Sequence, residues 1–118
     1  MATVAFTRAE AAGGCYRYTW AGLTPGDVGV PVSAPGAADR SVHVFGTLGG
    51  ASVVIEGSNE DAASVSDYET LHDAQGTPLS LSSAGIYFVA ENGNLVRPRI
   101  SGGSGSSVTV ILLARNTK

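Results

Sequence analysis

The residues best suited to chemistry in this sequence are two histidines, one of which, His72, lies next to Asp73. A histidine, a carboxylate and a serine form a nucleophilic triad when the serine sits at a sharp Gly-x-Ser-x-Gly turn between a strand and a helix. The nearest match, residues 103–105, lies in a turn with no helix after it. The sequence therefore predicts that His43 and His72 are solvated or interface residues and that the chain is not an enzyme. A hydrolase stays a third option, which loss of activity in His72→Ala would support.

Acidic residues crowd the middle third of the chain, where a glycosidase pair or a calcium loop could be imagined. Neither pattern has its required spacing, because the Asp-x-Asx-x-Asx-Gly run of a calcium loop is absent. We therefore predict solvated turn carboxylates, with no metal and no cofactor. The residues concerned are Glu56, Glu60, Asp61, Asp67, Glu69 and Asp73.

The glycine-rich run at 102–105 has the composition of a phosphate-binding loop. It lacks the lysine and the following helix that give such loops their field for anions. We predict a hairpin turn there.

Arg97 and Arg99 are two residues apart and so face the same side of a strand. Two adjacent like charges need a partner. One interpretation is cross-strand pairing with Glu56 or Glu91, and the other is docking against acidic groups of a neighbouring subunit.

The overall composition favours contact with other proteins over interaction with nucleic acids or membranes. Only 14% of the residues are charged and the formal net charge is −3, with no basic stripe to neutralise phosphates. No apolar run reaches the ~18 residues of a membrane span, and the start of the sequence lacks a secretory signal, so synthesis in a cytoplasm is expected. The single cysteine, Cys15, excludes an internal disulfide.

Two-residue alternation, typical of half-buried strands, recurs along the chain. In the first example Tyr16, Tyr18 and Trp20 point to one side, as core or interface residues. Strands at 41–47 and 51–56 are predicted to form a hairpin through Gly49 and Gly50. The apolar run at 107–114 predicts a strand that is buried on both faces or packed beneath loops. About seven to nine strands emerge.

Two segments depart from this regularity. Pro98 cannot donate to a ladder, which places the strand at 95–100 at a sheet edge or a bulge. Residues 21–39 hold three prolines and predict a long ordered connection that lies against another surface.

Many short strands, glycine-rich turns and no convincing helical period predict an all-β fold. We expect a single antiparallel β-sandwich domain over residues 1–118, of jelly-roll or immunoglobulin-like type, with an extended N-terminal arm or loop. Residues 1–14 and 21–39 are the expected contact arm and loop.

The order of motifs resembles that of small structural proteins of tailed-phage heads, the capsid cement or decoration proteins, over nearly the whole chain. The motifs that carry this resemblance are YTWAGL (18–23), GDVGVPV (26–32), DRSVHV (39–44), GGASVVIEGSN (49–59), VRPRISGG (96–103) and VTVILLAR (108–115). The resemblance implies a subunit on the virion surface that binds across junctions between major capsid proteins and stabilises the mature head. The alternative is a carbohydrate- or receptor-binding sandwich of a tail fibre or baseplate.

The partners expected on this basis are the major capsid protein and further copies of the chain, with a trimer favoured over a dimer. The expected interface residues are Phe6, Leu23, Val28, Val30, Val32, Arg97 and Arg99.

Overall fold

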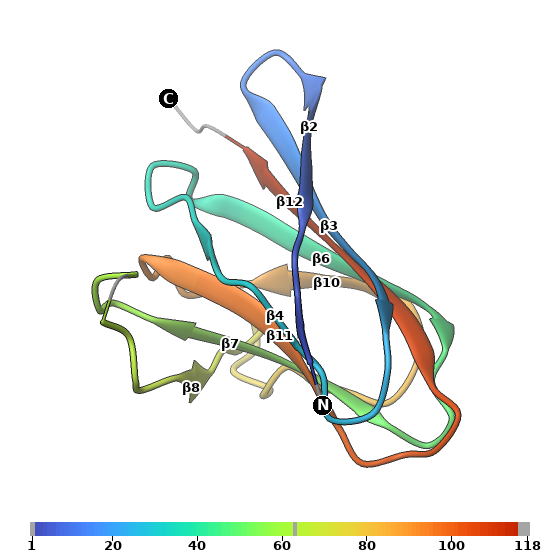
Figure 1. The fold of residues 1–118 in the computed structure, drawn as a ribbon. Coiled ribbons are helices and arrows are strands. Elements are labelled where there is room, and N and C mark those ends of the chain that lie inside the picture. The colour runs from blue at the N-terminus through green and yellow to red at the C-terminus, as the bar shows by residue number, and fades with distance from the viewer. Residues whose placement is uncertain (1, 63, 116–118) are drawn as a thin grey trace.

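The computed structural model describes residues 2–62 and 64–115. All helix or strand structure in those residues is β-strand, and the strands form two sheets that pack face to face (Figure 1). The predicted all-β sandwich is confirmed. No helix long and apolar enough to cross a membrane is found among the described residues.

The first sheet, sheet A, has seven strands in the described residues. β1, β4, β11, β7 and β8 follow one another across it, while β5 also pairs with β11 and β9 with β7. Its strands are β1 (Thr3–Val4), β4 (Val28–Gly29), β5 (Val32–Ser33), β7 (Ser52–Ser58), β8 (Glu69–Thr70), β9 (Ser80–Leu81) and β11 (Leu95–Ser101).

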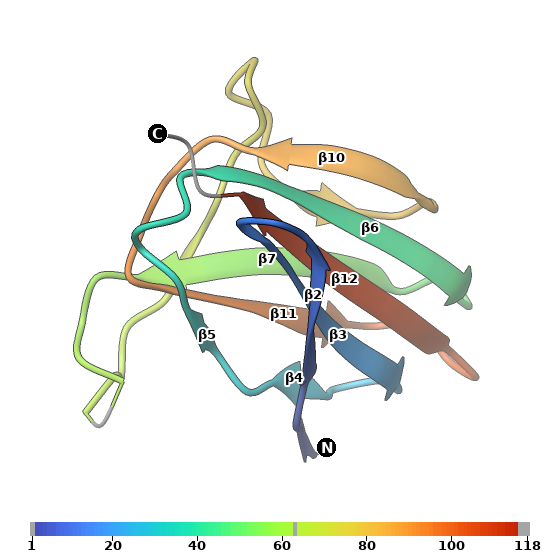
Figure 2. The ribbon, with the colours of Figure 1, turned by 90° about the horizontal axis from the view of Figure 1, so that it is seen from above.

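The second sheet, sheet B, has five strands within the described ranges, in the order β10-β6-β12-β3-β2, and Figure 2 shows it from above. Its strands are β2 (Thr7–Ala12), β3 (Cys15–Leu23), β6 (Asp39–Thr47), β10 (Gly85–Val89) and β12 (Ser107–Arg115). The twelve strands of the described residues exceed the expected number because five of them are only two residues long.

The antiparallel pairs are nested along the chain. β3 pairs with β12, β4 and β5 pair with β11, β6 pairs with β10, and β7 pairs with β8 and β9. This is the topology of one long hairpin rolled up into two sheets, which is the jelly roll. The structure thus selects between the two topologies that the sequence left open.

Two predicted hairpins are connections between the sheets. The strands at 41–47 and 51–56 form where expected, but β6 belongs to sheet B and β7 to sheet A. The turn between them does use positive φ at Gly49 (59°) and Gly50 (81°). The turn at 102–105 likewise leads from β11 in sheet A to β12 in sheet B, and Ser104 N donates a hydrogen bond of 3.0 Å to Gly49 O.

The prediction that Pro98 places its strand at a sheet edge or a bulge is wrong, because β11 has partners on both sides and pairs with β7 without a register shift. β7 runs along one side of it, with Ile55 opposite Pro98. On the other side β5 pairs with residues 95 and 96 and β4 pairs with residue 99. The partner strand is therefore interrupted at the proline, where no N–H is offered.

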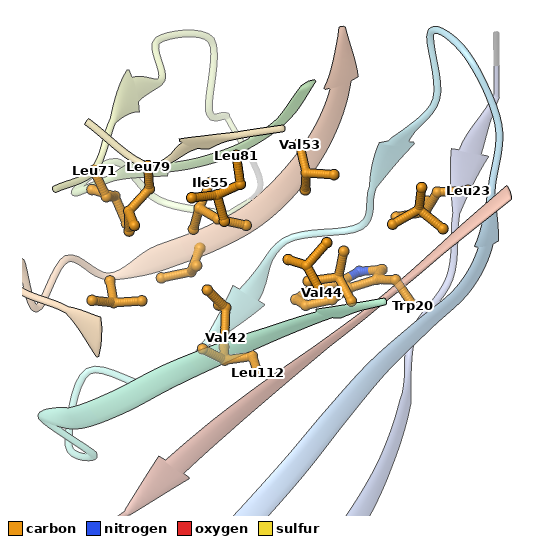
Figure 3. Packing of buried hydrophobic residues seen from close by; sticks show 14 of the residues in the cluster. Trp20, Leu23, Val42, Val44, Val53, Ile55, Leu71, Leu79, Leu81 and Leu112 are labelled. Atoms are coloured by element: carbon orange, nitrogen blue, oxygen red, sulfur yellow. The ribbon is translucent and has the colours of Figure 1, made fainter. Parts of the chain in front are cut away.

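The core fills the space between the sheets (Figure 3). Trp20, Val42, Val44 and Leu112 enter from sheet B. The opposite wall comes from sheet A and its connections, with Val53, Ile55, Leu71, Leu79 and Leu81. β12 alternates between buried and half-buried positions, so only one of its faces is fully buried.

The two segments expected to be contact arm and loop fold back on the sandwich. β2 pairs with β3 and β1 pairs in parallel with β4, so the chain before residue 14 takes part in both sheets. Residues 21–39 contain the end of β3 together with β4 and β5. The Asp27 carboxylate accepts hydrogen bonds of 2.9 Å from the backbone N–H groups of Thr24 and Ala2, which ties the two segments together.

Candidate functional site

The outer face of sheet B carries the large apolar side chains that the described residues expose most. Ile86 is 69% exposed, Phe88 45% and Phe45 37%. Ile111 and Leu113 of β12 lie half-buried on the same face. We call this surface the apolar sheet face, defined by Phe45, Ile86, Phe88, Ile111 and Leu113.

The strand register aligns these side chains in rows across the sheet, because directly opposite residues point the same way. One row runs Ile86, His43, Ile111, Thr19, Thr7. The next runs Phe88, Ser41, Leu113, Arg17, Ala9. The apolar residues gather at the β10 side of the sheet, and small or polar residues follow toward β2.

Few charges interrupt this face. Among the outward-facing residues of the five strands, Arg17, Asp39 and Arg115 carry a formal charge, and the last two approach each other at 3.4 Å. A hollow of about 200 Å³ lies in the face, lined by Arg17, Ser41, His43, Ile86, Ile111 and Leu113. Such a surface can bind another protein with little cost of charge desolvation.

The interface residues predicted from the sequence lie elsewhere. Leu23 and Val32 are 0% and 2% exposed within the core of the chain itself, which leaves no side-chain surface for a partner. Phe6 is half-buried and meets the rings of Tyr18 and Trp20 edge-on, with ring centroids 5.6 and 6.0 Å apart.

Val28 and Val30 are half-buried in or beside β4. Their contact with a partner, like that of Phe6, stays a prediction. Tyr18 and Trp20, which the sequence left between core and interface, are buried.

Arg97 and Arg99 pair across the strands with Glu56 on the outer side of sheet A. Glu56 is 5% exposed, and its two oxygens accept hydrogen bonds from Arg97 Nε at 2.8 Å and Arg99 Nε at 3.2 Å. The Arg97 guanidinium also stacks on Tyr68, 3.6 Å from the ring centroid. The cross-strand interpretation therefore explains both arginines, and Glu56 is not a solvated turn carboxylate. Docking to a neighbour through these arginines stays a prediction.

His72 contacts Glu91 rather than Asp73. Its Nδ1 lies 2.6 Å from Glu91 Oε2, and its backbone N–H donates to Glu91 Oε1 at 2.8 Å. Burial raises the pKa of Glu91, but the two hydrogen bonds from His72, a hydrogen bond from the backbone of Glu91 itself and the electrostatic interaction with His72 together bring the pKa below its usual value. Asp73 instead accepts from the backbone N–H groups of Gln75 and Thr77 and closes its own turn.

Another hollow lies beside Glu91. It measures about 380 Å³ and is lined by Gly57, Ser58, Asn59, Glu69, Leu71, Glu91, Asn92 and Gly93. Nearby, Glu60 accepts backbone hydrogen bonds from Asp67 and Ser66, which lower its pKa and close the loop after β7. Within residues 2–62 and 64–115, no three His, Cys, Asp or Glu side chains gather to hold a metal ion.

The sequence contains a signal for the apolar sheet face, although none of its residues was among the predicted interface residues. The segment 86–89, Ile-Tyr-Phe-Val, is apolar at every position, and Val44 is followed directly by Phe45. An edge strand that is apolar on both sides has more hydrophobic surface than one core can cover. Only the position of the strand in the folded sheet shows which of its side chains remain exposed to solvent.

These features define a jelly-roll protein with an exposed apolar sheet face. No protein-family model matches the chain, and no curated protein does either. Among solved structures, the fold is shared with the SPBc2 prophage-derived protein YomS at a TM-score of 0.63 and 12% identity. The alignment covers 85% of this chain and 93% of that protein.

Other similar structures include enzymes. FeII HppE has a TM-score of 0.44 at 13% identity over 92% of this chain and 48% of its own. A structure of oxalate oxidase has a TM-score of 0.47 at 10% identity over 94% and 50%. The prediction that the chain is not an enzyme is corrected on this finding, since cupin-like enzymes are among its structural neighbours. At these TM-scores the likeness assigns no reaction to this chain.

Proposed function

We propose that this protein is a structural subunit of a phage particle, a capsid cement or decoration protein that binds across junctions of the major capsid protein and stabilises the mature head. The observation that carries the proposal is the apolar sheet face, which exposes Phe45, Ile86 and Phe88 on a surface with few charges. Large exposed apolar patches mark sites of interaction with other proteins.

The size of the face indicates how it binds. The exposed parts of these three side chains amount to roughly 300 Å², since an aromatic side chain buries about 150–250 Å² in full. Covering that area contributes about 7 kcal/mol at ~25 cal/mol per Å². Association itself costs an estimated ~4–15 kcal/mol. One such contact is therefore weak, and binding to a shell with many equivalent sites gains from avidity.

Two further observations support the proposal that this chain is part of a phage particle. The jelly roll is shared with a prophage-derived protein over nearly the whole length of both chains. The motif order resembles that of tailed-phage head proteins, as described above. A subunit that binds the assembled shell better than free capsid protein stabilises the shell by mass action.

The experiment is co-sedimentation of the purified chain with shells of the phage that encodes it, prepared without this protein. The parent chain is expected to sediment with the shells and to raise their melting temperature. Ile111→Lys places a charge in the middle of the apolar sheet face and should abolish co-sedimentation. Ser80→Lys, on the exposed side of β9 in sheet A, is the matched control and should bind like the parent.

Circular dichroism and thermal melting of each variant show whether it folds. If Ile111→Lys does not fold, Phe45→Lys replaces it, because Phe45 is more exposed than Ile111. Absence of the chain from purified virions by mass spectrometry, or normal shell binding by the folded variant, would overturn the proposal.

The second candidate is a carbohydrate-binding subunit of a tail fibre or baseplate. The hollow of about 380 Å³ favours it, because Asn59, Glu69, Glu91 and Asn92 in its wall can form hydrogen bonds with a sugar. Against it, Tyr18 and Trp20 are buried and offer no stacking platform for sugars. Binding of the purified chain to a glycan array, together with no binding to shells, would support this candidate over the first.

A further inference from the structure

Among the strands that the structure describes, β10 forms the longest sheet edge without charged side chains. β10 is the last strand of sheet B, with β6 on one side only (Figure 2). An edge strand offers a row of backbone N–H and C=O groups, and proteins usually shield such edges with charges, prolines, bulges or short strands. In the described part of the chain, the other edges use two of these devices and β10 uses none.

The other edges are shielded by charge or by length. β2, at the far edge of sheet B, carries Arg8 and Glu10. β1 and β8, at the two edges of sheet A, are two residues long. β10 is five residues long, contains no proline and pairs with β6 in unbroken register from Gly85 to Val89.

The absence of charge extends beyond the strand. Residues 74–90 contain no Asp, Glu, Lys or Arg, which is the longest such run in the chain. With a net charge of −3, two copies of the chain repel each other weakly, and acidic residues that meet at a contact add to this repulsion. Contact along β10 brings no like charges together, so this edge fits a second copy of the same chain.

We propose that β10 pairs antiparallel with β10 of a second copy about a two-fold axis at Tyr87, which joins the two B sheets into one. The inference rests on the proposed function as a contact-making subunit and names one of its partners. In this register Ile86 lies opposite Phe88 of the other copy on the outer face, and the pair occurs twice by symmetry. Both side chains are exposed in the single chain, at 69% and 45%.

The expected strength of this contact follows from its size. A five-residue strand is about 17 Å long, and the edge of a two-layer sandwich is about 15–20 Å across, which gives roughly 300 Å² per copy. This is below the ~800 Å² per partner of a stable complex, so the pairing is weak in solution and adds to shell binding. The proposal thus favours two-fold contacts over the trimer expected from the sequence.

Cysteine cross-linking tests the register directly. In a Cys15→Ser background, Ile86→Cys and Phe88→Cys are purified separately, mixed at high concentration and treated with a mild oxidant. Directly opposite residues have Cα atoms about 4.5–5.5 Å apart, within the range of a disulfide. Residues 86 and 86 of two copies are diagonal neighbours about 7–8 Å apart, beyond that range.

The mixture should therefore form the 86–88 disulfide several-fold faster than either variant alone forms a homodimer. The matched control is a mixture of Thr7→Cys and Ala9→Cys, exposed residues of β2 at the charged edge of the same sheet. It should give only the random product ratio of one 7–7 to two 7–9 to one 9–9.

A random product ratio for 86 and 88 would overturn the two-fold pairing. If that happens while the parent chain still binds shells, only this inference fails. If the 86–88 product forms but shells are not bound, the proposed function fails and the pairing stands.

Discussion

The indole Nε1 of Trp20 donates a hydrogen bond of 2.9 Å to the backbone carbonyl of Val30. Trp20 belongs to β3 of sheet B, and Val30 lies between β4 and β5 of sheet A. This single bond spans the two layers and holds a segment rich in proline and glycine against the core. Together with the pairing of β4 and β5 with β11, it keeps residues 21–39 within the sandwich.

Gly29 lies under the same indole and is expected to tolerate no side chain. A Cβ at residue 29 would stand 2.5 Å from Trp20 Nε1 and 2.7 Å from Pro98 Cδ. Gly29→Ala should therefore lower the free energy of unfolding by about 1–3 kcal/mol, the usual cost of overpacking. Urea denaturation measures the change. Gly36→Ala, where a Cβ meets nothing within 4 Å, is the control, and an equal loss there would contradict the argument.

Replacement of Glu56 by alanine should destabilise the protein by about 1–3 kcal/mol, because it leaves Arg97 and Arg99 side by side without their shared acceptor. Glu56 is nearly buried, whereas the two arginine side chains are 22% and 39% exposed, which moderates the loss. Asp39→Ala removes an exposed pair with Arg115 at 3.4 Å and should cost no more than ~1 kcal/mol. Thermal or urea unfolding of both variants tests the difference, and similar losses would show that the burial of Glu56 is immaterial.

The free energy of unfolding is expected to fall in acid, because Asp27 becomes protonated. Its pKa is lowered by hydrogen bonds from the Thr24 backbone N–H, from the Thr24 hydroxyl and from the Ala2 N–H. Since the folded pKa lies below the unfolded value of about 3.9, the stabilisation is present above pH ~4 and is lost as the pH falls through the folded pKa. Unfolding measured at neutral pH and near pH 3 should show this decrease.

Two variants check the source of that decrease. Asp27→Asn should flatten the acid dependence, because no proton can be taken up at residue 27. Thr24→Val removes only the hydroxyl donor and should flatten it less. An acid dependence unchanged in Asp27→Asn would place its origin elsewhere.

Arg40 is expected to be irreplaceable by lysine. Arg40 is 1% exposed, and its guanidinium donates to the carbonyls of Ala34, Ala37 and Gly93, so that one planar group joins two loops. Lysine has one nitrogen and cannot reach these carbonyls with the same geometry. Arg40→Lys should cost about 1–3 kcal/mol and increase amide exchange in residues 34–38. Unchanged exchange there would refute the joining role.

The strands at 41–47 and 51–56 show that a local pattern predicts where strands lie but not which strands pair. The alternation placed both strands correctly, and Gly49 and Gly50 do adopt positive φ. The partner was wrong, since β6 pairs with β10 and β12 instead of β7. A glycine-glycine turn suits a tight reversal within one sheet and equally a crossing between two sheets. Local sequence therefore does not specify the neighbour.

The arginines and the interface residues show the same limit. The spacing of Arg97 and Arg99 put them on one side of a strand, and the partner predicted for them was Glu56 or Glu91. The structure confirms Glu56. By contrast, Leu23 and Val32 looked like surface anchors in a proline-rich connection, and they are core residues. An apolar side chain in an irregular segment has no periodicity to show which way it faces.

By itself, the sequence determined that this chain is all β, where most of its longer strands lie, and which residues of the alternating strands share a face. These properties are local, because they depend on backbone preference and on a period of two residues. The tertiary structure decided the rolled-up pairing, the inner position of Pro98 and the exposure of Ile86 and Phe88 at a free edge. Strand pairing joins residues far apart in the chain, and a strand that is apolar on both sides acquires an inside and an outside only when the opposite sheet covers one of them.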